Sequence, residues 1–163
     1  MKKLFICFSV VALTLVSIVL GSAVLFAGVD ADEIPGKNDK SITDVLATLE
    51  SKGFTYIASI EFDDHLWKVE TLCNGEETKY RVDPKILAIT KTKTEKEDDF
   101  QPPKDVKSLK EALTLAYGKG YKTIRAIEFD KGRWKISVAD NDTERELIID
   151  SDSKKILFDR IDD

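Results

Sequence analysis

The feature that most constrains the fold of this chain is an internal repeat. Residues 41–89 align with residues 108–156 without a gap, at a constant offset of 67 and with roughly fifteen identities. Gly53 and Trp67 recur as Gly120 and Trp134 among these identities. A single offset held over such a span is typical of a duplicated structural unit. The sequence therefore predicts two consecutive copies of one small structural module.

Each copy is expected to begin with a helix. Apolar residues at helical spacing form one face in both copies, and such a face needs a sheet to cover it. A serine followed three residues later by an acid is typical of a capping box, and a glycine in the left-handed region ends a helix. The residues that fit are Ser41, Asp44 and Gly53 in the first copy and Ser108, Glu111 and Gly120 in the second.

Short antiparallel strands are expected after each helix. In the first copy these are residues 54–62, 66–72, 78–82 and 86–90, separated by turn sequences. Asn74-Gly75 is the strongest hairpin signal. Centring the turn on these two residues places apolar side chains opposite one another on one face, as a single core requires. The predicted pairs are Trp67 with Val82, Val69 with Tyr80, Trp134 with Ile149, and Ile136 with Leu147.

These patterns lead to an α+β fold made of two tandem repeats. Each repeat is predicted to be a helix packed on its own small antiparallel sheet of three to four strands. The repeats are assigned to residues 41–92 and 108–161, and the polar stretch 93–107, with its Pro102-Pro103 pair, is assigned to a linker. How the two repeats pack, and whether copies of the chain associate, stays open at this stage.

The N-terminal segment is expected to direct the chain out of the cytoplasm. Lys2 and Lys3 precede an uncharged run from residue 4 to residue 26. Val29-Asp30-Ala31, with compact residues one and three positions before the cut, is the first candidate cleavage site, and Gly21-Ser22-Ala23 is the second. A helix of about 23 apolar residues is also long enough to remain as a membrane anchor. Residues 1–31 are thus a signal peptide or an uncleaved anchor. In either case we expect a periplasmic, secreted or anchored protein that faces the extracytoplasmic side, and membrane contact only through an uncleaved segment.

The region after each helix resembles a known family. Ile60-Glu61-Phe62-Asp63 leads to Trp67-Lys68-Val69-Glu70 and then to Val82-Asp83-Pro84-Lys85 before an apolar strand, and the second copy repeats this order. The pattern resembles the PepSY domain, a module found in propeptides of thermolysin-like metalloproteases. This resemblance implies a non-enzymatic, extracytoplasmic module that restrains peptidases. The chain contains no His-Glu-x-x-His motif of its own.

Two pairs of opposite charges recur at equivalent positions. Extending the hairpin register places Glu61 opposite Lys68, and Glu128 opposite Lys135, on the solvent face. An exposed cross-strand ion pair is worth about 0.2 to 1 kcal/mol, which would account for the recurrence without any ligand. The same four residues are the candidate binding residues of an exposed sheet face.

No catalytic or metal-binding pattern is found in the sequence. His65 lies in a predicted turn and is replaced by Gly132 in the second copy, while Cys73 is replaced by Asp140. The acidic run at residues 140–144 lacks the glycine and glutamate positions of an EF-hand loop. There is no Gly-rich phosphate loop and no Gly-x-Ser-x-Gly motif. We therefore expect no enzymatic activity, no catalytic residues, no metal and no cofactor.

Charge narrows the range of partners. The formal net charge is −5, and becomes −6 when Lys2, Lys3 and Asp30 are removed with residues 1–31. An acidic surface argues against nucleic acid or anionic lipid as a partner. The expected function is binding of another envelope protein, as a regulator or inhibitor of an envelope peptidase. The alternative is a non-enzymatic envelope structural or small-ligand carrier protein, which a persistent apolar cavity between helix and sheet would favour.

Overall fold

The structure is a computed structural model that describes residues 34–97, 101–140, 143–152 and 154–161. The predicted signal segment, residues 1–31, lies outside the described residues. In the described part of the chain, no helix has the length and apolar character needed to cross a membrane. The elements in chain order are α1 (Ile42–Ser51), β1 (Ile57–Asp63), β2 (Leu66–Cys73), β3 (Glu76–Val82), β4 (Ile89–Lys96), α2 (Lys107–Gly118), β5 (Thr123–Asp130), β6 (Arg133–Asp140), β7 (Thr143–Asp150) and β8 (Ile156–Ile161).

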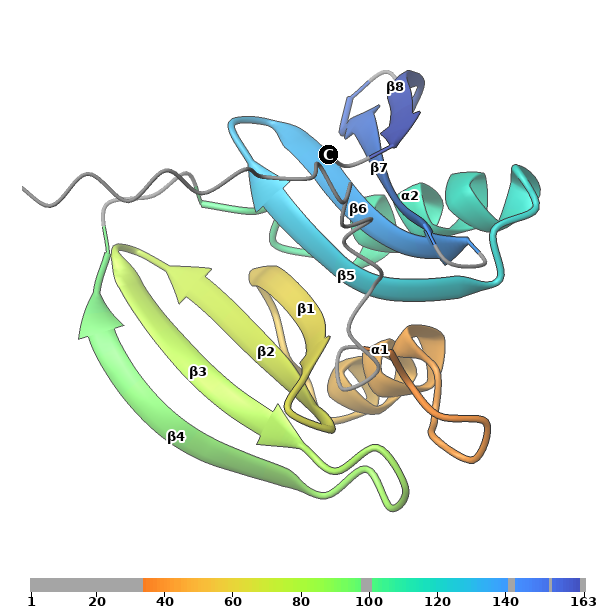
Figure 1. Cartoon of the computed structure of the whole chain (residues 1–163). Coiled ribbons are helices and arrows are strands. Elements are labelled where there is room, and N and C mark those ends of the chain that lie inside the picture. The colour runs from red at the N-terminus through yellow and green to blue at the C-terminus, as the bar shows by residue number, and fades with distance from the viewer. Residues whose placement is uncertain (1–33, 98–100, 141–142, 153, 162–163) are drawn as a thin grey trace, which may run out of the picture.

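The strands form one continuous antiparallel sheet in the order β4-β3-β2-β1-β5-β6-β7-β8 (Figure 1). The predicted fold class, two tandem repeats that each have a helix and a small sheet of their own, is therefore wrong. The sheets merge because β1 and β5 pair with each other. An unpaired strand edge carries backbone donors and acceptors that a second edge can satisfy. The alternation of apolar residues does not indicate which strand lies at such an edge.

The junction between β1 and β5 is symmetric. Ile60 and Ile127 occupy equivalent positions of the repeat and lie directly opposite each other. On either side, Ser59 lies opposite Glu128 and Glu61 opposite Ala126. Each half thus contributes the same positions, as in the interface of a two-fold dimer. An approximate two-fold axis consequently passes through the Ile60 and Ile127 pair.

A single core lies between the sheet and the two helices, which cover the same face (Figure 1). Helix α1 contacts β5 as well as its own half, and α2 contacts β6. Trp67 and Trp134 are 0% and 1% exposed, which confirms their predicted place in the core. Because the buried side chains of both halves form one cluster, burial of apolar surface in this cluster stabilises both halves together. Of the described elements, neither helix covers the other face of the sheet, which we call the open face.

The predicted hairpin registers are confirmed in both halves. Trp67 lies opposite Val82 on β2 and β3, and the second half has the equivalent pairing. Asn74 and Gly75 have φ angles of 53° and 76°, as a two-residue hairpin turn of the primed type requires. The other predicted pairs are also present: Val69 with Tyr80, Trp134 with Ile149, and Ile136 with Leu147.

The two helices begin differently. The hydroxyl of Ser41 accepts a hydrogen bond from the Asp44 amide, and the Asp44 carboxylate accepts one from the Ser41 amide, so the first capping box is confirmed. The second is wrong, because α2 begins one residue before Ser108, with Val106 as its N-cap. The Ser108 hydroxyl instead accepts a hydrogen bond from Trp134 Nε1 at 2.8 Å.

The chain that leads into α2 contacts the turn between β2 and β3 and the residue that precedes β1. The Asn74 amide donates to the Gln101 side chain at 2.9 Å, and the Tyr56 amide donates to the Lys104 carbonyl at 3.2 Å. Pro102, between these two contacts, is buried. These contacts fix the path of the described residues 101–106 from the sheet to α2.

Candidate binding face

The open face carries two rows of side chains that cross the sheet from strand to strand. Successive pairings place residues of neighbouring strands opposite one another, and the β1 and β5 pairing joins the rows of the two halves. One row contains Arg81, Lys68, Glu61, Ala126, Ser137, Glu146 and Arg160, and the other contains Lys79, Glu70, Ser59, Glu128, Lys135, Ile148 and Phe158. The junction strands therefore lie at the centre of a mainly polar surface.

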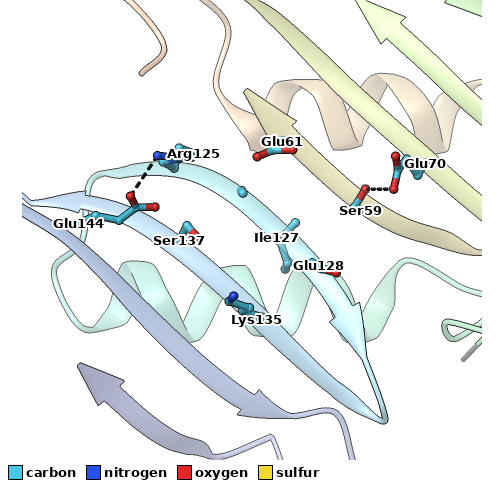
Figure 2. A pocket seen from close by; sticks show the side chains of 10 residues that line it. Ser59, Glu61, Glu70, Arg125, Ile127, Glu128, Lys135, Ser137 and Glu144 are labelled. Carbon is cyan, nitrogen blue, oxygen red and sulfur yellow. Dashed lines mark hydrogen bonds and ion pairs between the residues drawn. The ribbon is translucent and has the colours of Figure 1, made fainter. Parts of the chain in front are cut away.

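A hollow of about 400 Å³ lies over the junction, and we call it the junction pocket (Figure 2). Its lining includes three of the four predicted binding residues, Glu61, Glu128 and Lys135, together with Ser59, Glu70, Arg125, Ser137 and Glu144. Two contacts shape its walls: Ser59 donates to Glu70 at 3.0 Å, and Arg125 donates to Glu144 at 3.1 Å. The symmetric pairing of β1 and β5 is what brings the two predicted glutamates into one pocket.

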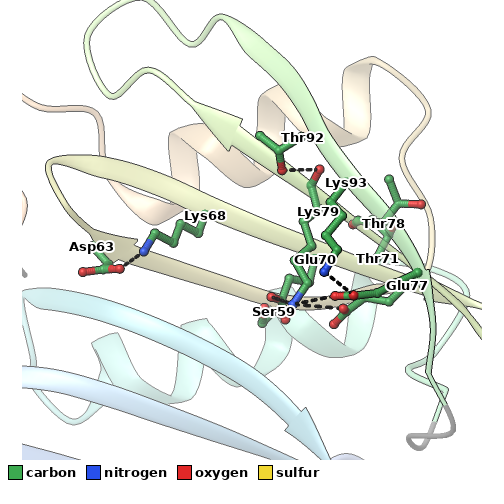
Figure 3. Close-up of polar contacts among 11 residues, drawn as sticks. Ser59, Asp63, Lys68, Glu70, Thr71, Glu77, Thr78, Lys79, Thr92 and Lys93 are labelled. Atoms are coloured by element: carbon green, nitrogen blue, oxygen red, sulfur yellow. Dashed lines mark hydrogen bonds and ion pairs between the residues drawn. The ribbon is translucent and has the colours of Figure 1, made fainter.

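The predicted cross-strand positions are confirmed, but the predicted ion pairs are not formed. Glu61 lies opposite Lys68, and Glu128 opposite Lys135. Lys68 instead pairs with Asp63 (Figure 3). It also pairs with Asp64 in the adjoining turn, and Lys135 pairs with Glu146 at 2.8 Å. Among the described residues, Glu61 and Glu128 make no ion pair. Both carboxylates are exposed at the junction pocket.

A charge network on the first half was missed by the sequence analysis. Lys79 on β3 pairs with Glu77 at 3.0 Å, Glu70 at 3.1 Å and Glu95 at 3.5 Å (Figure 3). Its hydrogen bond to Glu77 raises the Lys79 pKa above its ordinary value, against the opposing effect of burial. Burial also raises the pKa of Glu77, and the hydrogen bond from Lys79 only partly offsets this.

The equivalent network on the second half has the opposite sign at its centre. Glu146, which corresponds to Lys79 at the offset of 67, has a side chain that is 4% exposed. It pairs with Lys135 at 2.8 Å and with Arg160 at 2.6 Å. Comparison of identical residues overlooks this position, because a charge inversion counts as a mismatch. The opposite charges of Lys79 and Glu146, at aligned positions in the middle of predicted strands, could have indicated a charge network in each half.

Replacing Glu146 by Gln is expected to lower the free energy of unfolding by about 1 to 3 kcal/mol at pH 7, because two cations lose their charged partner. Burial raises the pKa of Glu146, but the hydrogen bonds from Lys135 and Arg160 outweigh burial and lower it overall. A carboxyl with a lowered pKa stabilises the fold above its unfolded pKa, and this contribution is lost as the pH falls through the folded pKa.

Urea unfolding of the wild type and E146Q at several pH values tests this expectation. The difference between the two proteins should be full at pH 7 and shrink as the pH falls from about 5 to about 3. Glu76→Gln, a change at an exposed hairpin residue, is the control and should have little effect throughout. A difference for E146Q that is the same at every pH would contradict the assigned role of the charge.

The described residues contain no group of three or more His, Cys, Asp and Glu side chains placed to hold a metal ion. Cys73 is a half-buried free thiol at the end of β2, and His65 lies in the turn between β1 and β2. His65 and Asp64 both have positive φ angles, which is typical of a tight two-residue turn. Neither residue lines the junction pocket.

The fold and the pocket define a class of small α+β module whose polar sheet face is left open by its helices. The chain belongs to the family described as peptidase propeptide and YPEB domain (PepSY_2), which matches residues 10–93, just over half of the chain. This confirms the predicted PepSY assignment of the first half. The match ends before α2, so the assignment of residues 108–161 to the same family stays a prediction from the internal repeat.

Comparison with solved structures gives one further likeness. A crystal structure from Clostridium difficile 630, of a protein described provisionally as a lipoprotein, covers 78% of this chain and 96% of its own. The two are 17% identical, with a TM-score of 0.45. No curated protein matches the chain.

Proposed function

We propose that this protein is an extracytoplasmic binding module that restrains an envelope peptidase by contacting it through the open face. The observation that carries the proposal is the junction pocket, which both halves line and which holds the exposed Glu61 and Glu128. The family description, which refers to peptidase propeptides, supports a peptidase as the partner. The proposed location is periplasmic, secreted or anchored through residues 1–31.

The charges around the junction pocket favour a cationic side chain of the partner as the bound group. Arg125 and Lys135, the two cations of the lining, are paired with Glu144 and Glu146. Of the four glutamates that line the junction pocket, Glu70 and Glu144 make ion pairs, with Lys79 and Arg125. Glu61 and Glu128 make no ion pair with a described residue. A lysine or arginine that enters between them would form charge-assisted hydrogen bonds. Lys68 lies in the same row as Glu61 and would contact the partner at the rim.

A carrier function has no comparable observation in its favour. The space between the helices and the sheet is occupied by large side chains that are nearly or fully buried, including Phe62, Trp67 and Trp134. The junction pocket lies on the open face, and most of the side chains that line it are polar or charged. A surface of this kind suits a protein partner better than an apolar small molecule.

The proposal is tested with the full chain, tagged at its C-terminus and expressed in the organism it comes from. Chemical crosslinking and affinity purification should recover one stoichiometric peptidase, and adding purified protein to that peptidase should slow its cleavage of a labelled casein substrate. The double variant Glu61→Lys and Glu128→Lys should lose both effects. Charge repulsion with the bound cation is the reason.

The matched control is the double variant Glu76→Lys and Asp152→Lys. It makes the same change in net charge at two exposed residues outside the junction pocket, and it should behave like the wild type. Equal loss in both double variants would show only an effect of net charge. Unchanged inhibition by the Glu61 and Glu128 variant would overturn the proposed site, and recovery of no peptidase would overturn the proposed partner.

A further inference from the structure

The two edges of the sheet differ in how they are protected. β4 and β8 are the edge strands. From residue 90 to residue 94, β4 alternates threonine and lysine, and all five of these residues are exposed. Lysine on an edge strand opposes the addition of a further strand. On β8, by contrast, Leu157, Phe158 and Ile161 are 40%, 57% and 51% exposed.

Asp159 and Arg160, the two charged residues of β8, both make ion pairs within the protein. Asp159 accepts hydrogen bonds from Arg145 at 2.8 Å and from Tyr121 at 2.9 Å. Arg160 donates two hydrogen bonds to the nearly buried Glu146. Among the described residues, no further strand pairs with the outer edge of β8, and exposed apolar side chains lie on the same strand. Both are features of a site for strand addition.

A second hollow, of about 260 Å³, adjoins β8 on the open face. Phe158 and Ile148 lie opposite each other on β8 and β7 and supply its apolar part. Its charged lining consists of Arg133, Lys135, Arg160 and Asp130. Lys135 and Arg160 both pair with Glu146, and Arg133 is the third cation of this lining in a chain whose net charge is −5. The side chain of Arg133 is exposed and makes no hydrogen bond or ion pair with a described residue.

We propose that β8 is the docking edge for an extended segment of another protein, which adds to the sheet as a further strand. The segment carries apolar and acidic side chains at alternate positions on its inward face. Residues two apart on a strand point to the same side, so an apolar side chain lies over Phe158 while an acidic side chain two residues away lies beside Arg160, whose side chain is 66% exposed. The backbone of β8 supplies affinity, and the hollow supplies selectivity for acidic segments.

Charge argues against a second copy of this chain as the occupant. Antiparallel pairing of two β8 strands into one continuous sheet would place Phe158 and Arg160 of the second copy beside the same face. This would bring a further cation to a hollow that already has three. The β8 edge is also distinct from the junction pocket, so this proposal stands apart from the proposed peptidase contact, although Lys135 lines both hollows.

The test uses the full chain and fluorescein-labelled synthetic peptides of about eight residues, the length of a typical strand. One peptide has Phe and Glu at alternate inward positions, and the other has Lys in place of Glu. Fluorescence anisotropy should show the acidic peptide binding about tenfold more tightly than the basic one. Phe158→Lys should weaken binding by about tenfold or more, through lost apolar contact and the edge charge.

Ile86→Lys is the matched control, because Ile86 is an apolar residue that is 75% exposed in the loop between β3 and β4. It should leave peptide affinity unchanged. Hydrogen exchange should show that backbone amides of β8, and not those of β4, become protected when the acidic peptide is bound.

Several results would overturn the proposal. These are no binding of the acidic peptide, equal binding of both peptides, or an affinity that F158K leaves unchanged. A wild-type dimer seen by sedimentation and lost in F158K would assign the edge to a second copy instead. Peptide binding that is lost in the Glu61 and Glu128 double variant but kept in F158K would move the peptide to the junction pocket. Failure of peptidase inhibition alone would leave the β8 result intact.

Discussion

Replacing Leu46 by Ala is expected to lower the stability of both halves of the chain together, by about 2 to 5 kcal/mol. Leu46 lies on α1 in the first half and is 1% exposed. Its side chain belongs to the one core cluster that includes residues of both helices and both sets of strands. Loss of its packing should therefore destabilise a single cooperative unit.

The two tryptophans allow this expectation to be measured separately in each half. Trp67 is in the first half and Trp134 in the second, and the chain has no others. In a Trp67→Phe background, fluorescence reports only the second half. Adding L46A should then shift the guanidinium midpoint of Trp134 fluorescence as far as that of circular dichroism. Ile86→Ala, at an exposed residue, should shift neither. If L46A left the guanidinium midpoint of the Trp134 fluorescence unchanged, the two halves would unfold independently.

The junction itself should show strong coupling between Ile60 and Ile127. Both are 0% exposed, and they lie directly opposite each other on β1 and β5. Changing either to Ala is expected to cost about 2 to 5 kcal/mol of unfolding free energy. Because the two side chains are cross-strand neighbours, the double variant should depart from additivity by about 0.5 to 3 kcal/mol.

Urea unfolding of the two single variants and the double variant measures the coupling. The control cycle pairs Ile60→Ala with Leu147→Ala, since Leu147 is equally buried but lies on β7, three strands from β1. At about 4.8 Å per strand the two sites are about 14 Å apart, and their effects should add within about 0.5 kcal/mol. Additive effects of Ile60 and Ile127 would argue against a paired junction in solution.

Two halves of similar sequence within one chain need not keep the symmetry that the identical subunits of a dimer must keep. The core positions stay alike, with Trp67 and Trp134 buried in the same way. The open face has diverged, since Lys79 is replaced by Glu146 at the centre of the charge network. The edges have diverged as well, from the lysine-rich β4 to the apolar β8. A single chain thus presents distinct surfaces at its centre and at its edges.

The sequence by itself determined the features that depend on local backbone chemistry. The Asn74-Gly75 turn, the Ser41 capping box and the register of both hairpins follow from residues a few positions apart. Burial of Trp67 and Trp134 follows from the alternation of side chains along a strand. The resemblance to the PepSY domain is inferred from the same pattern of turns and strands, and the family match over residues 10–93 agrees with it.

Only the tertiary structure decided how the halves join and which charges meet. Pairing of β1 with β5 uses backbone groups that every strand edge carries, so no pattern of residue types predicts this pairing. Lys68 and Lys135 reach carboxylates that are closer in space than their direct cross-strand neighbours, and Ser108 accepts from Trp134 instead of capping α2. The physical reason is common to all of these: they depend on distances between distant segments, which exist only after the sheet and helices have packed.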